Sequence, residues 1–370
     1  MDADVAWANA VLRGPAMTEV RPPTQMGSIL YALNPDEQVV PFSPLRRTEL
    51  MSFVDWCRGP SERRTWQVAG GPGSGKTRLL IEAARQLSGD GVECGWVRHG
   101  QAVAAVEAAL RRSGRVLLIV DDADAYPRQQ DDLVGMLTLL ARNPEVQVRI
   151  ALSGREFASW WASARAAMDP ADQAVLTPAG RTVLSPSLAG QADQPQQFQG
   201  AVRHYARYFD RPVPAASLAG VATAISLTEL HAAAAVSAFN GLTGPVELKT
   251  ALRQLFTAEE AWWRANAASQ QPPLPLPLSL LQCAVTAATL VGAENMDQAT
   301  RRLAHLPGLT SSSHEQRTEL ALWLHQLYAQ RGGQWLDPHL PAYLADRYAA
   351  LCASAHPGLP TALATAALIT

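Results

Sequence analysis

A glycine-rich segment in the N-terminal half of the chain has the residue types and spacing that can hold phosphate. Residues 70–77 read Gly-Gly-Pro-Gly-Ser-Gly-Lys-Thr, which fits the pattern G-x-x-x-x-G-K-[ST]. Glycines let the backbone curl so that successive N–H groups point inward, and a following helix adds the positive end of its dipole. An apolar stretch at 66–69 precedes the segment, and an apolar-periodic stretch at 75–87 continues it. The sequence predicts a phosphate-binding loop (P-loop); the alternative is a glycine-rich turn that binds nothing.

The side chains of this loop predict separate contacts with a nucleotide. Lys76 would reach the β- and γ-phosphates, and the Thr77 hydroxyl would ligate Mg²⁺, which prefers oxygen ligands. Among the 31 basic residues only Lys76 and Lys249 are lysines, so a lysine at position 76 favours a functional role. The residues of the loop that we expect to contact the nucleotide are Gly70, Gly71, Pro72, Gly73, Ser74, Gly75, Lys76, Thr77 and Arg78.

Two carboxylates follow an apolar run at residues 116–120, which is typical of a fully buried strand. Asp121 is the expected ligand on the magnesium side of the site. Asp122 is then placed to polarise an attacking water as the general base of phosphoryl transfer. The alternative for Asp122, and also for nearby Asp124, is a solvated turn or the N-cap of a helix.

A third segment predicts a residue that responds to the γ-phosphate. The apolar run at 146–152 is followed by Ser-Gly-Arg, and a guanidinium at the end of such a strand can bind a phosphate. We therefore predict Asp122 and Arg155 as the catalytic residues. The alternative for Arg155 is a surface arginine on a loop.

The elements around these segments alternate between strands and helices, which predicts an α/β fold with a parallel sheet covered on both faces. One further strand and two helices separate Lys76 from Asp121, which indicates a P-loop NTPase of the branch with an extra central strand, as in AAA+ ATPases. The predicted strands are 66–69, 93–97, 116–120, 146–152 and 181–184, and the predicted helices of this region are 48–57, 75–87, 102–112 and 131–142.

After about residue 190 the strand signal fades and helices take over. Six prolines in the first 45 residues predict an extended arm, and Gln-Pro-Pro-Leu-Pro-Leu-Pro predicts a stiff polyproline-type linker. Three helical segments and a short Gly-Gly-Gln-Trp-Leu element then predict a winged helix. The expected divisions are 1–45 extended arm, 46–190 P-loop NTPase core, 191–270 helical lid, 271–277 Pro-rich linker, 278–356 winged-helix-like domain and 357–370 stub of a repeat region.

Composition excludes several classes of protein. The 31 basic and 33 acidic residues nearly cancel, so the whole chain has no field that would attract nucleic acid or a membrane surface. Residues 279–352 hold five arginines against six acids, which disfavours DNA as a partner of a winged helix there. The four cysteines are far apart, so neither a disulfide framework nor a zinc site is indicated. No secretion signal or membrane span is visible, so we expect a cytoplasmic protein with no membrane partner.

Taken together, residues 36–356 resemble the STAND class of signalling ATPases, which are AAA+-related and include the bacterial NB-ARC- and NACHT-like regulators. Val40-Pro41-Phe42 followed by Arg46-Arg47-Thr48-Glu49-Leu50 resembles the motif that packs beside the nucleotide in that class. The resemblance therefore implies that Phe42 and Arg46 contact the nucleotide. Residues 118–122 resemble the paired-aspartate motif of the class, and residues 151–155 resemble its sensor strand.

The resemblance also covers the helical regions. Residues 226–231 are similar to the lid segment that closes over adenine in relatives, although the usual proline of that segment is absent here. Residues 322–328 and 335–338 resemble the winged helix. His231, His325 and His339 receive no role. Relatives continue into a tetratricopeptide-type repeat array, so the chain is expected to be a fragment or to lack that sensor.

The resemblance implies a nucleotide-dependent switch. ADP would hold the domains closed, and its exchange for ATP, with Mg²⁺ bound, would open them. The open protein would then assemble with itself and act on an effector protein. Hydrolysis would be slow, because P-loop enzymes without an arginine from a neighbour can lose roughly 10³ to 10⁵ in rate. Two alternatives remain at this point: a DNA-binding AAA+ ATPase similar to archaeal origin-recognition proteins, and a scaffold in which bound nucleotide is structural and is not hydrolysed.

Overall fold

The computed structural model describes residues 3–13, 28–60, 63–98, 100–124, 130–173, 177–185, 193–219, 225–327, 335–336, 340 and 342–369. Its residues divide into two compact units. The first comprises Met1–Arg21, Pro35–Gln194 and Val221–Leu227, and the second comprises Pro22–Asn34, Pro195–Gly220 and Thr228–Thr370.

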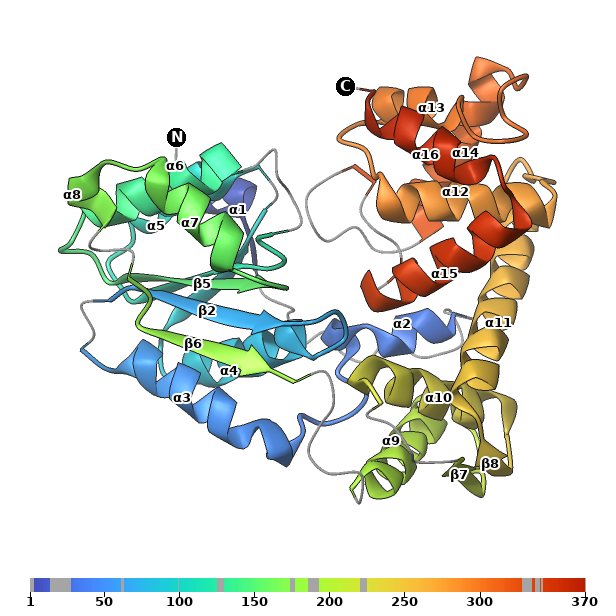
Figure 1. Ribbon diagram of the computed structural model, residues 1–370, viewed down its shortest axis with the longest axis horizontal. Helices are drawn as coiled ribbons and strands as arrows, with labels where there is room; N and C mark the ends of the chain where they lie inside the picture. The colour runs from blue at the N-terminus through green and yellow to red at the C-terminus, as the bar shows by residue number, and fades with distance from the viewer. Residues whose placement is uncertain are drawn as a thin grey trace. The chain divides into compact units, whose positions relative to one another are not determined.

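The first unit is an α/β domain built on a six-stranded sheet (Figure 1). Its elements are α1 (Ala3–Ala10), β1 (Val11–Arg13), the 3₁₀ helices η2 (Pro35–Glu37) and η3 (Pro44–Arg46), α3 (Arg47–Arg58), β2 (Thr65–Gly70), α4 (Lys76–Gly89), β3 (Glu93–Val97), α5 (Ala102–Ala109), β4 (Val116–Val120), α6 (Gln130–Arg142), β5 (Val148–Gly154), α7 (Ala158–Ala166), α8 (Pro170–Gln173) and β6 (Gly180–Leu184).

The strand order of the sheet is β1-β3-β4-β5-β2-β6, and every pair is parallel except β1 with β3. The predicted parallel sheet and the predicted extra central strand are confirmed. The strand that separates β2 from β4 is β5, which follows β4 in the chain, whereas β3 lies on the outer side of β4. The carboxyl ends of β4, β5 and β2 therefore meet at one edge of the sheet, in that order, and this order positions the site.

Helices cover both faces of the sheet, as Figure 1 shows. On one face α3 and α4 pack against Leu117 and Ile119 of β4. On the other face α1, α5, α6 and α7 pack against Leu118, Ile150 and Leu152. All five strand residues of β4 are buried, which explains why its sequence is a continuous apolar run without alternation.

The prediction of an extended arm over residues 1–45 is wrong for residues 3–13, which form α1 and β1. The prolines of this region begin only at Pro15, so they place no restriction on the preceding helix. Trp7 and Val11 are buried, and β1 pairs antiparallel with β3. Burial of these two side chains outweighs the weak helical signal of a segment only eight residues long.

Gly95 of β3 is the point at which α1 and β1 approach the sheet. A Cβ atom at Gly95 would lie 2.1 Å from Cγ1 of Val11 and 3.0 Å from Cζ2 of Trp7. We expect Gly95→Ala to lower the free energy of unfolding by about 1–3 kcal/mol, the usual cost of overpacking a well-filled core. Urea unfolding followed by tryptophan fluorescence measures the change.

A matched substitution controls for the loss of glycine itself. A Cβ atom at Gly114 would meet nothing within 4 Å, so Gly114→Ala is expected to be neutral. Combining Gly95→Ala with Val11→Ala removes the closest clash, so part of the stability should return. Equal stability of Gly95→Ala and Gly114→Ala would contradict this packing of β1.

The second unit is mainly helical. Its elements are α2 (Ile29–Leu33), α9 (Gln194–Tyr208), β7 (Ala216–Leu218), α10 (Leu227–Asn240), β8 (Gly244–Val246), α11 (Leu248–Ala268), α12 (Leu278–Leu290), α13 (Met296–Leu303), α14 (His314–Leu327), α15 (Ala342–Ala355) and α16 (Leu359–Ala367), with α9 and α10 each beginning at one residue of the first unit.

Helices α12, α13 and α14 pack together, and an antiparallel bridge joins Ala293 to Leu336. These are the three helices and the small β element predicted for the winged helix. The residues between α14 and this bridge, and His339 beyond it, lie outside the described residues. The Pro-rich segment is non-helical as predicted, but the backbone N–H of Leu274 donates to the carbonyl of Ala267, so the segment packs back on α11 within the same unit. The finer predicted boundaries stay predictions.

Candidate functional site

The P-loop joins the end of β2 to the start of α4, and its backbone requires glycine at defined positions. Gly73 and Gly75 have positive φ angles of 75° and 91°, a region that glycine enters without steric cost. At Gly70 a Cβ atom would lie 2.5 Å from Oγ of Ser74 and 2.8 Å from the carbonyl of Leu184. The loop therefore folds tightly on itself, and the N–H of Ser74 donates to the carbonyl of Gly71 at 3.2 Å.

Lys76 is buried at the first residue of α4. Its ammonium donates to the carbonyl of Gly70 at 3.0 Å and lies 4.0 Å from a carboxylate oxygen of Asp122. The positive charge therefore sits between the P-loop backbone and the carboxyl end of β4, where an anionic ligand of the loop would meet it.

Thr77, Asp121 and Ser153 form a line of hydrogen-bonded side chains across the edge of the sheet. The Thr77 hydroxyl donates to Oδ2 of Asp121 at 2.7 Å. The Ser153 hydroxyl donates to the other oxygen of the same carboxylate, Oδ1. Both oxygens of Asp121 are thus held in place, which fixes the carboxylate beside the P-loop.

Asp122 adopts a left-handed backbone conformation with φ of 49°. Its N–H donates to Oγ of Ser153 at 2.9 Å, which stabilises this otherwise disfavoured geometry. Burial is the largest cause of a pKa of Asp122 raised to about 6; the charges of Asp121 and Asp124 also raise it, while Lys76 and Arg155 oppose the rise. The side chain remains 47% exposed, so the carboxyl is accessible to solvent. A carboxyl with a raised pKa is a stronger base than an ordinary aspartate.

The carboxylate of Asp124 stabilises the turn after β5 through hydrogen bonds. Its carboxylate accepts hydrogen bonds from the backbone N–H groups of Arg155, at 2.6 Å, and Glu156, at 3.2 Å. Asp124 therefore holds a turn that lies far from it in the sequence, a role that differs from the solvated turn and the helix N-cap considered above. The Arg155 residue itself is exposed, and its charge lies near enough to lower the pKa of Asp122. Its predicted response to a γ-phosphate stays a prediction.

Arg46 lies against the P-loop. Its guanidinium donates to the carbonyl of Ser74 at 3.5 Å, to the carbonyl of Ser185, and to Glu49 at 3.1 Å. It therefore ties the loop backbone to the segment after β6. A direct contact of Arg46 with a nucleotide stays a prediction.

Phe42 and Arg78 are partly buried and lie together, with the guanidinium carbon of Arg78 5.9 Å from the centre of the Phe42 ring. Burial lowers the pKa of Arg78, and the Glu82 charge partly restores it. One terminal nitrogen of Arg78 is buried without a hydrogen bond, although it lies 3.9 Å from Glu82. Contacts of Phe42 and Arg78 with a nucleotide stay predictions.

Leu227, in the predicted lid segment, lies beside the P-loop, because a Cβ atom at Gly75 would lie 3.5 Å from its Cδ1.

His231 and His325, the two described histidines without a predicted role, contact residues outside the candidate site. His231 bonds the hydroxyl of Tyr205 at 3.1 Å, and the His325 ring stacks on Trp335 at 4.5 Å.

The arrangement fits a nucleotide with Mg²⁺. The Ser74 hydroxyl is buried and has no hydrogen-bond partner, so the loop contains a polar atom that a ligand can satisfy. Thr77 and Asp121 offer hydroxyl and carboxylate oxygens side by side, which are hard ligands of the kind Mg²⁺ prefers. Within the described part of the chain no three His, Cys, Asp or Glu side chains gather as a metal site.

Ser153 is the residue of the candidate site whose contacts were not predicted from the sequence. The sensor strand was expected to place Arg155, yet the fully buried hydroxyl two residues earlier is the group that contacts both aspartates. The feature of the sequence that could have indicated this contact is a hydroxyl side chain at the end of an otherwise apolar run. The register of β4 with β5 pairs Val120 with Leu152, which puts Ser153 beside Asp121.

Ser153→Ala tests this contact. We expect ATP turnover to fall about tenfold, because removing one partner of a buried charged group costs about 1–3 kcal/mol and frees the carboxylate to move. Ser153→Thr keeps the hydroxyl and should retain most of the activity. Steady-state phosphate release measures both variants. Equal activity of Ser153→Ala and the parent chain would show that the serine does not position the aspartates.

Comparisons with known proteins identify neighbours only at the level of structure. No protein-family model matches the chain, and no curated protein matches it. The structure of ORC1 of Aeropyrum pernix in complex with DNA is similar at a TM-score of 0.41 and 14% identity, over 90% of this chain and 97% of that one. Cdc6p from Pyrobaculum aerophilum is similar at a TM-score of 0.37 and 12% identity, over 90% and 98% of the two chains.

A structure of Drosophila ORC bound to DNA is similar at a TM-score of 0.35 and 12% identity, over 87% of this chain and 88% of that one. Likeness at this level supports no statement about ligands, so the site has to be interpreted from its own geometry. The charge-based expectation that DNA is disfavoured, and the STAND subclass, stay predictions. None of the helices in the described ranges is long and apolar enough to span a bilayer.

Proposed function

We propose that the chain binds ATP and ADP with Mg²⁺ and hydrolyses ATP slowly. The observation that carries this proposal is the alignment of Thr77, Asp121 and Ser153 beneath a P-loop whose lysine lies 4.0 Å from Asp122. Isothermal titration calorimetry with ATP and ADP, each with Mg²⁺ and with EDTA, tests it. Binding that strengthens with Mg²⁺ is expected. No heat of binding for either nucleotide would refute the assignment.

Each residue of the site has a task in this reaction. The P-loop N–H groups and Lys76 hold the β- and γ-phosphates, and Thr77 and Asp121 hold the metal. When bound, Mg²⁺ neutralises charge on the phosphate oxygens. Asp122 orients a water molecule through its exposed carboxylate and accepts a proton from it. Asp124 keeps the turn that carries Arg155 in place.

We further infer that the site operates as a switch of the STAND kind, closed with ADP and open with ATP, and that the open form assembles and acts on an effector protein. Support comes from the sequence motifs of that class, at residues 40–50, 118–122 and 151–155. A ligand that contacts two mobile parts of a protein shifts their equilibrium by its differential contacts. Sedimentation velocity with ADP and with a non-hydrolysable ATP analogue tests assembly. Identical distributions would exclude nucleotide-driven assembly under those conditions.

Phosphate release distinguishes the switch from a scaffold with structural nucleotide. A scaffold would bind nucleotide and gain stability from it without turnover, by about 2.7 kcal/mol at a ligand concentration 100 times the dissociation constant. Measurable release that depends on Asp122 would exclude that alternative.

Two arginines of the C-terminal helices are engaged within the protein, which counts against duplex DNA as a partner of this region. Arg301 pairs with Asp297 at 3.1 Å, and Arg302 donates to the carbonyl of Gly292 at 2.9 Å. Duplex binding needs free positive charge, because neutralised phosphates supply most of the affinity. A mobility-shift titration at low salt tests this, and tight binding of a duplex would reverse the conclusion.

A further inference from the structure

Helix α9 of the second unit carries positive charge along one face. Arg203 and Arg207 are exposed and four residues apart on the helix, so they lie on the same side of it, about 6 Å apart along its axis. Arg211, exposed just after the helix ends, is a third arginine. Asp210 is the only acidic residue in the range 194–211. This part of the surface therefore has an excess of positive charge.

The three arginines have no acidic partner among the described residues. Arg203, Arg207 and Arg211 form no ion pair there. Burial lowers the pKa of His204, and the charge of Arg207 lowers it further. The positive charge of this face is therefore available to a group outside the molecule.

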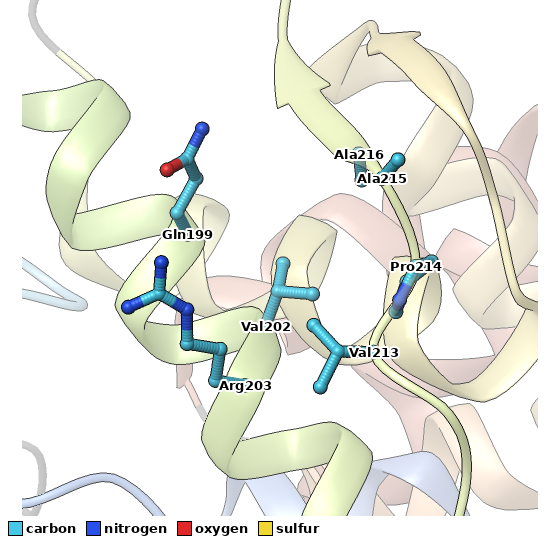
Figure 2. Close-up of a pocket in the computed structure, with 7 residues that line it drawn as sticks. All are labelled: Gln199, Val202, Arg203, Val213, Pro214, Ala215 and Ala216. Carbon is cyan, nitrogen blue, oxygen red and sulfur yellow. The ribbon is translucent and has the colours of Figure 1, made fainter.

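An exposed apolar side chain lies beside these arginines. Val213, on the segment between α9 and β7, is 58% exposed. Figure 2 shows Val213 across from the helix that carries Gln199 and Arg203, and all three residues line one groove. We call Arg203, Arg207, Arg211 and Val213 the basic surface. It presents charge and an accessible apolar group together.

Helix α14 of the same unit carries the opposite charge. Glu315 and Glu319 are exposed and four residues apart, and Leu322 is 39% exposed three residues further on. Neither glutamate forms an ion pair with a described residue. Arg317, which lies between them in sequence, is partly buried and donates to the carbonyl of Ser312. We call Glu315, Glu319 and Leu322 the acidic surface.

The basic and acidic surfaces lie at opposite ends of the second unit. Figure 1 shows α9 beside β7 and β8 at one end, and α14 beside α13 and α16 at the other. Surfaces placed in this way cannot pair within one molecule. The whole chain has a formal net charge of −2, so two copies approach each other without strong repulsion. Pairing of the two surfaces therefore requires two copies of the chain.

The spacing of the charges matches between the two helices. On each helix the two charged residues are one turn apart, so two ion pairs can form at once. With the helices antiparallel, Arg203 meets Glu319. Arg207 then meets Glu315, one turn away.

The exposed apolar side chains select this antiparallel register. Leu322 follows Glu319 in α14, so pairing of Glu319 with Arg203 brings Leu322 towards Val213, which lies beside Arg203. In a parallel register Leu322 would extend past Arg207, away from that groove. The antiparallel register therefore pairs both the charges and the exposed apolar groups.

We propose that the basic surface of one copy binds the acidic surface of a second copy, and that this contact joins the chains in the assembled state. The inference rests on the self-assembly put forward under the proposed function, and it names the contact. A contact between two different surfaces leaves one of each unoccupied, so it continues into a ring or an open chain. Each exposed ion pair contributes at most about fivefold in affinity and is weakened by salt, so the contact is reversible.

Sedimentation velocity of the full chain, with ADP and with a non-hydrolysable ATP analogue, at low and at high salt, tests the contact. We expect species larger than a dimer with the ATP analogue at low salt, and fewer of them at high salt. The variants Arg203→Glu/Arg207→Glu and Glu315→Arg/Glu319→Arg should each associate about tenfold or more weakly, because like charges then face each other.

Charge exchange tests whether the two surfaces meet each other. An equimolar mixture of the two charge-reversed variants should associate as the parent chain does, because every basic group again faces an acidic one.

Single reversals combined within one chain test the register. Arg203→Glu with Glu319→Arg should restore association, whereas Arg203→Glu with Glu315→Arg should not.

Matched controls reverse the same number of charges elsewhere. Arg253→Glu/Arg264→Glu changes two exposed arginines of α11, and Glu107→Arg/Glu145→Arg changes two exposed acids of the first unit. Each control should change association by less than about threefold, because exposed charges outside a contact contribute little. Circular dichroism establishes that each variant is folded, and calorimetry establishes that it binds nucleotide as the parent chain does.

The outcomes separate this contact from the proposed function. Association with the ATP analogue that neither charge reversal weakens, or a mixture of the reversed variants that stays dissociated, would overturn the contact and leave the nucleotide switch in place. Association that both reversals abolish, but that ADP supports equally, would retain the contact and contradict its control by nucleotide. A parent chain that stays monomeric in every nucleotide state at low salt would overturn the contact, whatever calorimetry shows for nucleotide binding.

Discussion

Asp122→Asn is expected to lower the rate of ATP hydrolysis by about 10²–10⁴-fold, the usual contribution of a positioned general base. The carboxyl is accessible, its pKa is raised to about 6, and it lies 4.0 Å from the Lys76 ammonium, so it can accept a proton beside the phosphates. Asparagine has nearly the same shape and tolerates the left-handed backbone at this position, which separates loss of the base from loss of the fold. Phosphate release under single-turnover conditions measures the rate.

Affinity for nucleotide should change little in Asp122→Asn, because the metal-side carboxylate of Asp121 is untouched. Asp131→Asn is the matched control, since it removes an exposed carboxylate at the start of α6. It should have no effect on either quantity. Retained hydrolysis in Asp122→Asn would remove Asp122 from the reaction and leave it as a turn residue, the alternative that the sequence left open.

Lys76→Ala is expected to weaken binding of ATP and ADP by roughly 10- to 150-fold, which corresponds to the loss of about 1.5–3 kcal/mol from a charge-assisted hydrogen bond. The ammonium is buried and held by the Gly70 carbonyl, so it is preorganised for phosphate. Its removal also takes away a charge that lowers the pKa of Asp122, so that carboxyl should protonate at higher pH. Calorimetry with Mg²⁺-ADP measures the affinity without turnover.

Lys249→Ala provides an unusually direct control for this variant, because Lys249 is the only other lysine of the chain and is exposed on α11. It should bind nucleotide as the parent chain does. Equal affinity of the Lys76→Ala and Lys249→Ala variants would mean that the glycine-rich loop is a turn without a ligand.

The P-loop and the aspartates after β4 could be predicted from the sequence, because each is marked by a motif of neighbouring residues. The glycine pattern, the buried run before Asp121 and the helix that starts at Lys76 each lie within a few residues of one another, so a short window contains the whole signal. All five predicted core strands occur in the structure. The order in which they lie side by side follows from long-range packing, and it is this order that brings Ser153 to Asp121.

Several elements and contacts of the structure could not be predicted, because no hydrophobic periodicity or motif marks them in the sequence. β7 and β8 are three residues each, too short for alternation to be visible, and their pairing joins residues 28 positions apart. The role of Asp124 depends on a turn 31 residues further along the chain. The prolines of the first 45 residues predict an extended arm, whereas in the folded chain burial of Trp7 stabilises α1.

The antiparallel strand β1 also has a consequence for how the protein can be shortened. It covers the outer edge of β3, and α1 covers apolar residues of α5 on the same side. A chain trimmed to begin near residue 36, where the recognisable motifs start, would expose both. Unpaired strand edges next to apolar surface promote association between molecules. Residues 3–13 contain no motif, yet by covering these surfaces they protect the domain that carries the P-loop against aggregation.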